Sequence, residues 1–459
     1  MSDLSEIVKA YDVRGIVPEQ LNQTVARALG TAFVEMLRES GDDADRIVIA
    51  HDMRDSGPAL AAAFTAGANA AGTAVVHIGL GSTDELYYAS GSLQLPGAMF
   101  TASHNPAKYN GIKLCRSGAR PVGQDSGLAV VRHRAQELLR DPDAVADGPV
   151  EIEYQDLLGG YAEYLRRLVD LSGIRPLKVV VDAGNGMGGF TVPAVLGDQL
   201  LPGLPLEIVP LYFELDGTFP NHEANPLDPA NLVDLQAAVR EHRADLGLAF
   251  DGDADRCFVV DENGDPVSPS AITALVASRE LARFPGSTVI YNLITSAAVP
   301  EIIAEHGGRP VRSRVGHSFI KAEMARTNAV FGGEHSAHYY FRDFWFADTG
   351  MLAAMHVLAA LGVQSEPLSA FAAEYERYSA SGEINSTVDD ATAKIAQVRA
   401  AFPAATFDEL DGMTVQVGEG AWFNLRASNT EPLLRLNVEA PKPDRMAALR
   451  DEVLAIVRG

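Results

Sequence analysis

Short buried strands and amphipathic helices alternate along most of this 459-residue chain. The run RIVIAHD (46–52) is typical of a buried strand, and it is followed by a helical pattern, GPALAAAFTAGANAAG (57–72), and a second strand-like run, AVVHIGLG (74–81). The same alternation returns over 157–210 and again over 231–330. Strands that alternate with helices form parallel or mixed sheets with helices on both faces, so this pattern predicts three successive α/β domains.

The last part of the chain differs. A helical pattern, PLSAFAAEYERY (367–378), is followed by the polar stretch SASGEINSTVDD (379–390), which we interpret as a linker. Two strand regions, TVQVGEGAWFNLRAS (414–428) and LLRLNVEA (433–440), and a helix, DRMAALRDEVLAIVR (444–458), complete the chain and predict a smaller α+β domain. We therefore expect four domains, at residues 1–150, 151–255, 256–370 and 371–459.

Composition indicates an ordinary globular protein. Apolar residues make up 47% of the chain and charged residues 21%, which argues against disorder. The first residues lack a signal-peptide pattern and no apolar run reaches the ~18 residues of a membrane span, so we expect a cytoplasmic protein. Two cysteines, Cys115 and Cys257, are too few for a disulfide framework. The net charge of −24 argues against nucleic acid as a partner, and it requires local positive charge or a metal wherever an anionic substrate binds.

Two literal motif matches fail in detail. GxGxxG at 184–189 follows a strand, but Pro193 falls in the first turns of the next helix, which favours a glycine turn over a dinucleotide site. DGDADRCFVVDE (251–262) has most EF-hand ligands, yet Arg256 stands where that loop needs glycine, and strands flank it. A haloacid-dehalogenase nucleophile is also disfavoured, because Asp255 occupies the position of a required Thr or Val. GxSxG and Walker A patterns are absent from the sequence.

Three aspartates, Asp251, Asp253 and Asp255, follow the apolar run LGLAF. Their spacing of two would place all three carboxylates on one side of an extended chain. Carboxylates that converge repel one another unless a cation neutralises them, and a set of oxygen ligands favours Mg²⁺. The alternative is an acidic surface turn.

Ser103 lies in TASHNP (101–106), with Lys113 ten residues further on. A serine in such a place is commonly the N-cap of a helix. The free backbone N–H groups of a helix N-terminus also favour a phosphate ester there. Phosphorylation would add roughly −1.5 to −2 charge, for which a nearby metal is the natural counter-ion.

Two later loops group polar side chains between strands. The polar side chains of GGEHSAH (332–338) are suited to form hydrogen bonds with sugar hydroxyls. The alternative interpretation of this segment is an ordinary turn with a capping serine. RASNTEP (426–432) combines one guanidinium with short hydrogen-bonding side chains, which suits a phosphate cradle. The polar side chains concerned are Glu334, Ser336 and His338 in the first loop and Arg426, Ser428, Asn429 and Thr430 in the second.

With TASHNP, DGDADR, GEHSAH and RASNTEP in this order, the chain resembles the α-D-phosphohexomutase family across nearly its whole length. AYDVRG (10–15) and DGTFPNHEANP (216–226) are most similar to the bacterial phosphomannomutase/phosphoglucomutase branch. The resemblance implies three similar mixed-sheet α/β domains and a smaller C-terminal α+β domain around a central cleft. We expect a monomer or weak homodimer.

The activity that the resemblance implies is reversible phosphoryl transfer between the 1- and 6-positions of mannose or glucose phosphates. Ser103 would carry the phosphoryl group, the three aspartates and that phosphate would hold Mg²⁺, and a hexose 1,6-bisphosphate would be the intermediate and activator. Glu334, Ser336 and His338 would recognise the sugar, while the RASNTEP residues would hold the other phosphate. The remaining implied site residues are Arg14, Lys113 and Arg256 for positive charge, Lys113 and His104 for proton transfer, and His317 for orienting the sugar.

Three positions depart from the family pattern: Ala337 replaces a usual Gly, His335 a usual Met or Gln, and Ile294 a Lys found in some relatives. The sugar preferred is therefore open, and a phosphoglucosamine mutase is the main alternative. A Mg²⁺-dependent sugar phosphatase and a non-catalytic sugar-phosphate sensor are further alternatives. We expect the last domain, at 371–459, to move as a lid that closes on the distal phosphate.

Overall fold

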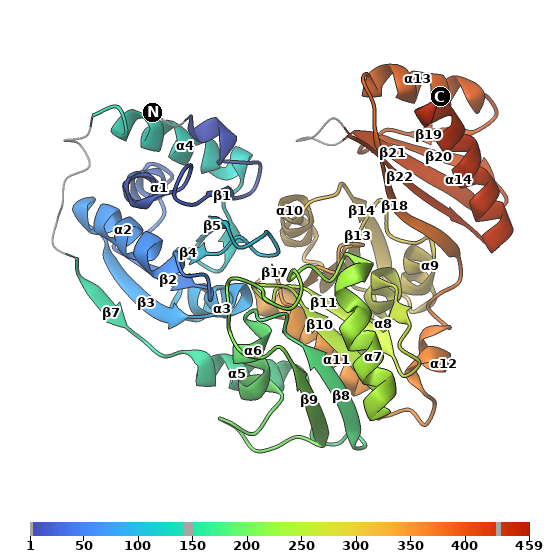
Figure 1. The fold of residues 1–459 in the computed structure, drawn as a ribbon, viewed down its shortest axis with the longest axis horizontal. Helices are drawn as coiled ribbons and strands as arrows, with labels where there is room; N and C mark the ends of the chain where they lie inside the picture. Colours follow the sequence, from blue (N-terminus) through green and yellow to red (C-terminus); the bar gives the residue numbers. More distant parts are fainter. Residues whose placement is uncertain (1–2, 142–149, 428–432) are drawn as a thin grey trace. The chain divides into compact units, whose positions relative to one another are not determined.

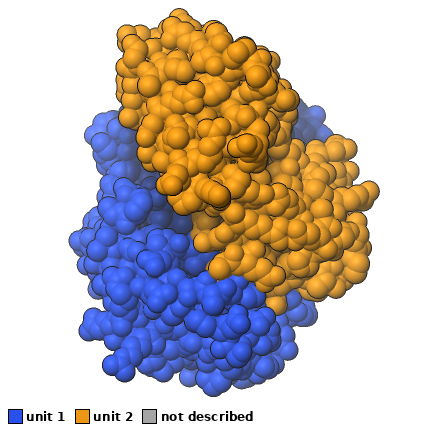
Figure 2. Space-filling view, turned by 90° about the vertical axis from the view of Figure 1, so that its right-hand side faces the viewer, with its two compact units in different colours: residues 1–267, 336–371 blue, residues 268–335, 372–459 orange. Residues whose placement is uncertain are grey.

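The computed structural model describes residues 3–141, 150–427 and 433–459. The chain divides into two compact units, one of residues 1–267 and 336–371 and the other of residues 268–335 and 372–459 (Figure 2). No helix in the described ranges is both long enough and apolar enough to cross a bilayer.

A mixed sheet with helices on both faces begins the first unit (Figure 1). Its strand order is β1 (Val13–Ile16), β5 (Tyr109–Arg116), β4 (Gly97–Phe100), β2 (Arg46–His51), β3 (Ala74–Leu80) and β7 (Ile152–Tyr154), and β6 (Arg120–Pro121) pairs with β5. The helices are α1 (Gln23–Glu39), α2 (Gly57–Ala70), α3 (Thr83–Leu93) and α4 (Leu128–Leu138). The sequence of β2 is apolar throughout because both faces of this strand are buried. Ile47 and Ile49 pack in the core with α1, α2 and α4, whereas Val48 and Ala50 pack on the other face with α3.

A second mixed sheet completes the first unit. Its order is β12 (Pro266–Val267), β11 (Cys257–Asp261), β10 (Leu246–Phe250), β8 (Leu177–Asp182) and β9 (Leu206–Leu211). The associated helices are α5 (Leu158–Leu168), α6 (Gly188–Val195), α7 (Val233–His242) and α11 (Gly350–Gly362), and β16 (Tyr339–Phe341) and β17 (Ala347–Asp348) form a hairpin. Short 3₁₀ helices occur at Leu4–Glu6, Gln124–Ser126, Pro229–Leu232 and Arg342–Phe344. This sheet contains residues on both sides of the domain boundary expected at 255.

The second unit has two sheets. Strand β13 (Thr288–Asn292) pairs in parallel with β14 (Arg309–Ser313) and β15 (Phe331–Gly333), beside α8 (Pro269–Arg283), α9 (Ala298–Glu305) and α10 (His317–Thr327). The C-terminal sheet is β18 (Ser379–Thr387), β22 (Leu433–Ala440), β21 (Ala421–Ala427), β20 (Met413–Gly418) and β19 (Thr406–Asp408), with α13 (Ala391–Ala401) and α14 (Pro443–Arg458) packed on it. Helix α12 (Leu368–Ala372) lies where the chain passes between the units. The α/β alternation and the C-terminal α+β fold expected from the sequence are confirmed.

Two local expectations are wrong. The polar stretch at 379–390 is not a linker, because Ser379–Thr387 forms the edge strand β18 along β22. An exposed edge strand needs few apolar residues, so its sequence lacks a strand pattern. The helix expected over 367–378 is only Leu368–Ala372, since Arg377 and Tyr378 instead bond the carboxylates of Glu301 and Glu305.

Candidate active site

Ser103 lies in the loop between β4 and β5, in the left-handed backbone region at φ +50°. The side chain is buried, and Oγ donates to Oδ2 of Asp251 (2.9 Å) and lies 3.2 Å from Nδ1 of His104. The serine N–H donates to Oγ1 of Thr101 (2.8 Å). Left-handed backbone is unfavourable for a residue with a side chain, so surrounding contacts must hold it in place.

No helix follows Ser103 in the structure, so the predicted helix N-terminus is wrong. Residues after the serine form turns and then enter β5, which pairs antiparallel with β4. Pro106 contributes to this outcome, because it has no N–H and disfavours helical backbone at Asn105.

The buried guanidinium of Arg54 holds the Ser103 loop, which the sequence did not lead us to expect. It donates to the backbone oxygens of Ser103 (2.9 Å), Asn105 (2.7 Å), Pro106 (3.1 Å) and Tyr109 (2.9 Å). Asp52 lies 3.3 Å from Nε of Arg54 and balances its charge. One cation thus fixes four carbonyl groups of the loop that bears the serine.

Replacing Arg54 by lysine is expected to lower the free energy of unfolding by about 3 kcal/mol and the catalytic activity about 100-fold. The single nitrogen of a lysine ammonium group cannot donate to all four carbonyl oxygens, so some of these oxygens would lose their hydrogen-bond donor. Urea unfolding and steady-state kinetics measure the two effects. The matched control is Arg46→Lys in the exposed ion pair with Glu153, which should change stability by about 0.5 kcal/mol or less. Equal effects in both variants would contradict this role.

The three aspartates follow β10, and one oxygen from each lies within 4.8 Å of the others. This confirms that they converge, but the chain there is a turn with Ala254 at φ +61° rather than the expected extended segment. All three side chains are buried. Oδ1 of Asp253 and Oδ1 of Asp255 have no hydrogen-bond partner in the structure, and such orphaned carboxylate oxygens fit a hard divalent cation.

Glycines bring the serine loop and the aspartate loop together. A Cβ at Gly252 would lie 2.4 Å from the backbone oxygen of Ser103, so only glycine fits there. A Cβ at Gly186 would lie 2.7 Å from the backbone oxygen of Gly252. The GxGxxG segment is therefore a tight turn packed on the aspartate loop, with Gly184 at φ +51°, as the alternative to a dinucleotide site predicted.

Two cations balance the aspartates. Nζ of Lys113 lies 2.7 Å from Asp253 and 2.5 Å from Asp255, and Nε of Arg256 lies 2.9 Å from Asp251. Burial alone would lower the pKa of Lys113, but the two carboxylates outweigh it and raise that pKa well above its ordinary value. Lys113 is therefore charged at neutral pH.

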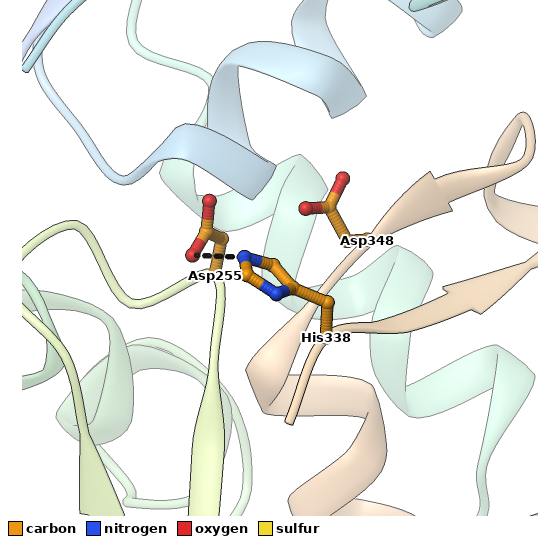
Figure 3. Close-up of side chains that lie close together, drawn as sticks. All are labelled: Asp255, His338 and Asp348. Carbon is orange, nitrogen blue, oxygen red and sulfur yellow. Dashed lines mark ion pairs between the residues drawn. The ribbon is translucent and has the colours of Figure 1, made fainter. Parts of the chain in front are cut away.

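A second cluster shares Asp255 and includes His338 and Asp348 (Figure 3). Nε2 of His338 lies 3.8 Å from Oδ1 of Asp255, and its Nδ1 lies 2.9 Å from Oγ of Ser336. The backbone of His338 forms a β-bridge with Arg256, which links the expected sugar loop to the aspartate loop. Ala337 has φ +64°, which explains why glycine is the less strained residue at this position.

A buried polar network supports the aspartate loop from the start of α3. Thr83 donates from Oγ1 to Asp253 (2.6 Å). The next residue, Asp84, accepts from Tyr161 (2.7 Å) and Thr349 (2.7 Å). Burial raises the pKa of Asp84 to about 6, and burial followed by repulsion from Asp84 raises the pKa of Glu85 to about 8.

Stability should fall as pH rises because of Glu85. Its folded-state pKa of about 8 exceeds the ordinary value of 4.5, so the folded state keeps a proton that the unfolded state loses. The contribution is complete below about pH 4.5 and lost through about pH 8, with a slope of up to about 1.4 kcal/mol per pH unit. Glu85→Gln should flatten the pH dependence of the urea midpoint between pH 5 and 8, whereas exposed Glu19→Gln should not. An unchanged slope in Glu85→Gln would contradict the assignment.

Arg14 and His104 lie near the serine loop. Arg14 bonds Asn105 Oδ1 (2.6 Å) and Asp12 (2.6 Å), and Asp253 and Asp255 also act on its charge. Burial, followed by the charges of Arg256 and Arg14, lowers the pKa of His104 well below 6.5. The imidazole is therefore neutral at neutral pH.

The other expected residues belong to the second unit. Glu334 is buried, and its Oε1 accepts from Nδ2 of Asn292 (3.3 Å) and from the N–H of Gly316 (3.2 Å), directly before His317 at the start of α10. Arg426 on β21 lies between Glu383 (3.4 Å) and Asp411 (3.9 Å). Ser428, Asn429 and Thr430 lie outside the described residues.

Comparisons with known proteins agree with this arrangement. Four family models match the chain: phosphoglucomutase/phosphomannomutase alpha/beta/alpha domains I (5–138), II (159–264) and III (268–378), and the C-terminal domain (383–456). A protein of Xanthomonas campestris pv. campestris named phosphohexose mutases is 41% identical, over 98% of this chain and 99% of its own. An Escherichia coli phosphomannomutase is 39% identical, over 98% of each chain.

A solved structure has the same fold. The phosphoglucomutase/phosphomannomutase family protein of Burkholderia thailandensis superposes with a TM-score of 0.87 at 32% identity, over 100% of this chain and 98% of that one. Four domain models and full-length relatives thus coincide with a buried serine beside three carboxylates. The chain belongs to the phosphoglucomutase/phosphomannomutase family of hexose-phosphate mutases.

Proposed function

We propose that this protein interconverts hexose 1-phosphates and 6-phosphates through a phosphoryl group carried on Ser103. The observation that carries the proposal is the hydrogen bond from Ser103 Oγ to Asp251, one of three buried carboxylates with orphaned oxygens among them. A cation bound to these carboxylates would neutralise the negative charge that phosphorylation adds to Ser103.

We assign the cation as Mg²⁺, held by Asp251, Asp253, Asp255 and the phosphate on Ser103. The donor set is entirely oxygen, which hard cations prefer. When bound, the ion supplies neutralisation of phosphate charge. Lys113 and Arg256 already contact these carboxylates and would orient them.

In the transfer, the bond from Ser103 Oγ to phosphorus breaks while a bond forms from a sugar hydroxyl to the same phosphorus. The net proton movement is from that hydroxyl to Ser103 Oγ. His104 is neutral and contacts Ser103 Oγ, so it is suited to accept the hydroxyl proton and pass it to that oxygen. Charged Lys113 is the second candidate for donating a proton to Ser103 Oγ. Reorientation of the bisphosphate and the reverse transfer complete the isomerisation.

The substrates that we propose are mannose and glucose phosphates. Several full-length relatives at 37–39% identity are named phosphomannomutase, which favours mannose phosphates over glucosamine phosphates. Ser336 and His338 would contact the sugar, whereas Glu334 would support the loop through Asn292 and Gly316 as well as bind a hydroxyl.

The distal phosphate would be bound by Arg426 with Ser428, Asn429 and Thr430. Glu383 and Asp411 flank the Arg426 guanidinium and would hold it in place until the phosphate arrives. We propose that residues 371–459 act as a lid over that phosphate. Small-angle scattering should show compaction with saturating substrate, and superimposable profiles would count against the lid.

A ³¹P NMR time course tests the function. The protein is incubated with Mg²⁺, mannose 1-phosphate and a trace of hexose 1,6-bisphosphate, and a growing 6-phosphate signal is expected. Glucose and glucosamine 1-phosphates, run in parallel, rank the sugars. Release of inorganic phosphate would instead indicate a phosphatase, and no reaction with any of the three sugars would indicate a sensor.

A further inference from the structure

A pocket of about 240 Å³ lies wholly within the second unit. Neither Glu334 nor Arg426 lines it. His335 does, and so do residues from the start of α8, the segment 375–382 and strands β21 and β22. It is therefore formed by other side chains than those assigned above to the sugar and to the distal phosphate.

Two buried polar atoms of this pocket have no partner. Within the described ranges, Oδ1 of Asn437 and Nδ1 of His335 are enclosed but make no hydrogen bond. Asn437 has only 6% of its surface exposed. Buried polar atoms in native proteins are nearly always paired, so these two atoms indicate a missing polar ligand.

The pocket is also negatively charged. Glu439 is 3% exposed, and its Oε1 accepts from Trp422 Nε1 (2.9 Å) and from the N–H of Ala297 (2.9 Å). Glu376 is exposed at the rim and accepts from the N–H of Ser268 (2.9 Å). Both carboxylates are thus held by neutral donors, and neither forms an ion pair with a described Lys, Arg or His. Glu439 is thus a buried carboxylate without a cation, which favours a positively charged ligand.

Aromatic rings line the same space. Trp422, Tyr375 and Tyr378 contribute to the wall, and aromatic faces attract ammonium groups, particularly where carboxylates lie nearby. Arg377 does not compensate the charge, because its guanidinium is bonded to Glu301 and Glu305. Burial lowers the pKa of His335, so its ring adds no positive charge at neutral pH.

We propose that this pocket binds a small organic ammonium ion that carries hydroxyl groups. Glu439, Glu376 and the ring of Trp422 would receive the ammonium group, and Asn437 Oδ1 and His335 Nδ1 would pair with the hydroxyls. The two carboxylates repel phosphate esters, so the site discriminates against the substrates of the mutase reaction.

Calorimetric titration in an amine-free buffer at pH 7 tests the proposal with two probes of one shape. Tris(hydroxymethyl)aminomethane has an ammonium group where 1,1,1-tris(hydroxymethyl)ethane has a methyl group. We expect the ammonium compound to bind about tenfold or more tightly than its neutral analogue. Equal affinities, or no heat of binding from either compound, would overturn the proposal.

Variants then locate the binding. Asn437→Leu and Glu376→Gln should each weaken binding of the ammonium probe about fivefold or more, while Glu374→Gln, an equally exposed glutamate that does not line the pocket, should not. Ser103→Ala should bind the probe like the unaltered protein. If Asn437→Leu fails to fold, Glu376→Gln still decides, and an unchanged affinity in that variant contradicts the site.

Fluorescence gives an independent readout. The chain has two tryptophans, Trp345 and Trp422, and only Trp422 lines the pocket. In a Trp345→Phe background, the ammonium probe should change the remaining emission with the dissociation constant found by calorimetry. Calorimetric binding without any change in emission would place the ligand elsewhere and overturn the assignment.

Discussion

Replacing Ser103 by alanine is expected to lower mutase turnover by about 10³-fold or more while leaving the fold intact. The substitution removes Oγ, the atom that we propose carries the phosphoryl group, together with its contacts to Asp251 and His104. It leaves the backbone contacts to Thr101 Oγ1 and Arg54 in place. A coupled assay of 6-phosphate formation measures the loss.

A labelling experiment separates the chemical role from a structural one. Protein incubated with ³²P-labelled hexose 1,6-bisphosphate should retain label on Ser103, and Ser103→Ala should retain none. The matched control is Ser92→Ala, an exposed serine in α3, which should keep both label and turnover. Turnover in Ser103→Ala within tenfold of the unaltered protein would exclude a phosphoserine mechanism.

Chelation of divalent cations is expected to reduce turnover by about 10³-fold, and added Mg²⁺ should restore it. The three buried carboxylates and a serine phosphate would otherwise repel one another, which Lys113 and Arg256 balance only in part. Activity is measured after dialysis against chelator and again across a Mg²⁺ titration.

The aspartate variants make this prediction specific. Asp253→Asn should raise the Mg²⁺ concentration for half-maximal activity at least tenfold, because it removes one anionic ligand. Asp265→Asn, on an exposed turn of the same unit, should leave that concentration unchanged. Full activity in the presence of chelator would show that Lys113 and Arg256 suffice and that the carboxylates serve another purpose.

Much of the first unit could be predicted from its sequence because the two faces of β2 are both covered. Ile47 and Ile49 meet one layer of helices and Val48 and Ala50 meet the other, which produces an uninterrupted apolar run. The convergence of the aspartates was also predictable from their clustering. The left-handed turn at Ala254, which brings the aspartates together, could not be predicted, since alanine does not favour that conformation.

Arg54 was missed for a different reason. Its partners are backbone oxygens of residues 103–109, and a backbone carbonyl leaves no mark in a sequence pattern. The available signal was the charge pair in HDMRDS directly after a buried strand. Strand β18 was missed because its partner β22 lies some fifty residues further on and supplies the pairing that its own polar residues do not indicate.

The close backbone approach between Ser103 and Gly252 has a kinetic consequence. In the cycle that we propose, Ser103 alternates between a neutral hydroxyl and a dianionic ester, and a flexible site would rearrange each time this charge changed. Here the main chains of the two loops are in direct contact, so the spacing between the serine oxygen and the carboxylates is set by backbone rather than by side-chain rotation. Such a site keeps its reorganisation energy low in both halves of the cycle, which allows one geometry to serve forward and reverse transfer equally.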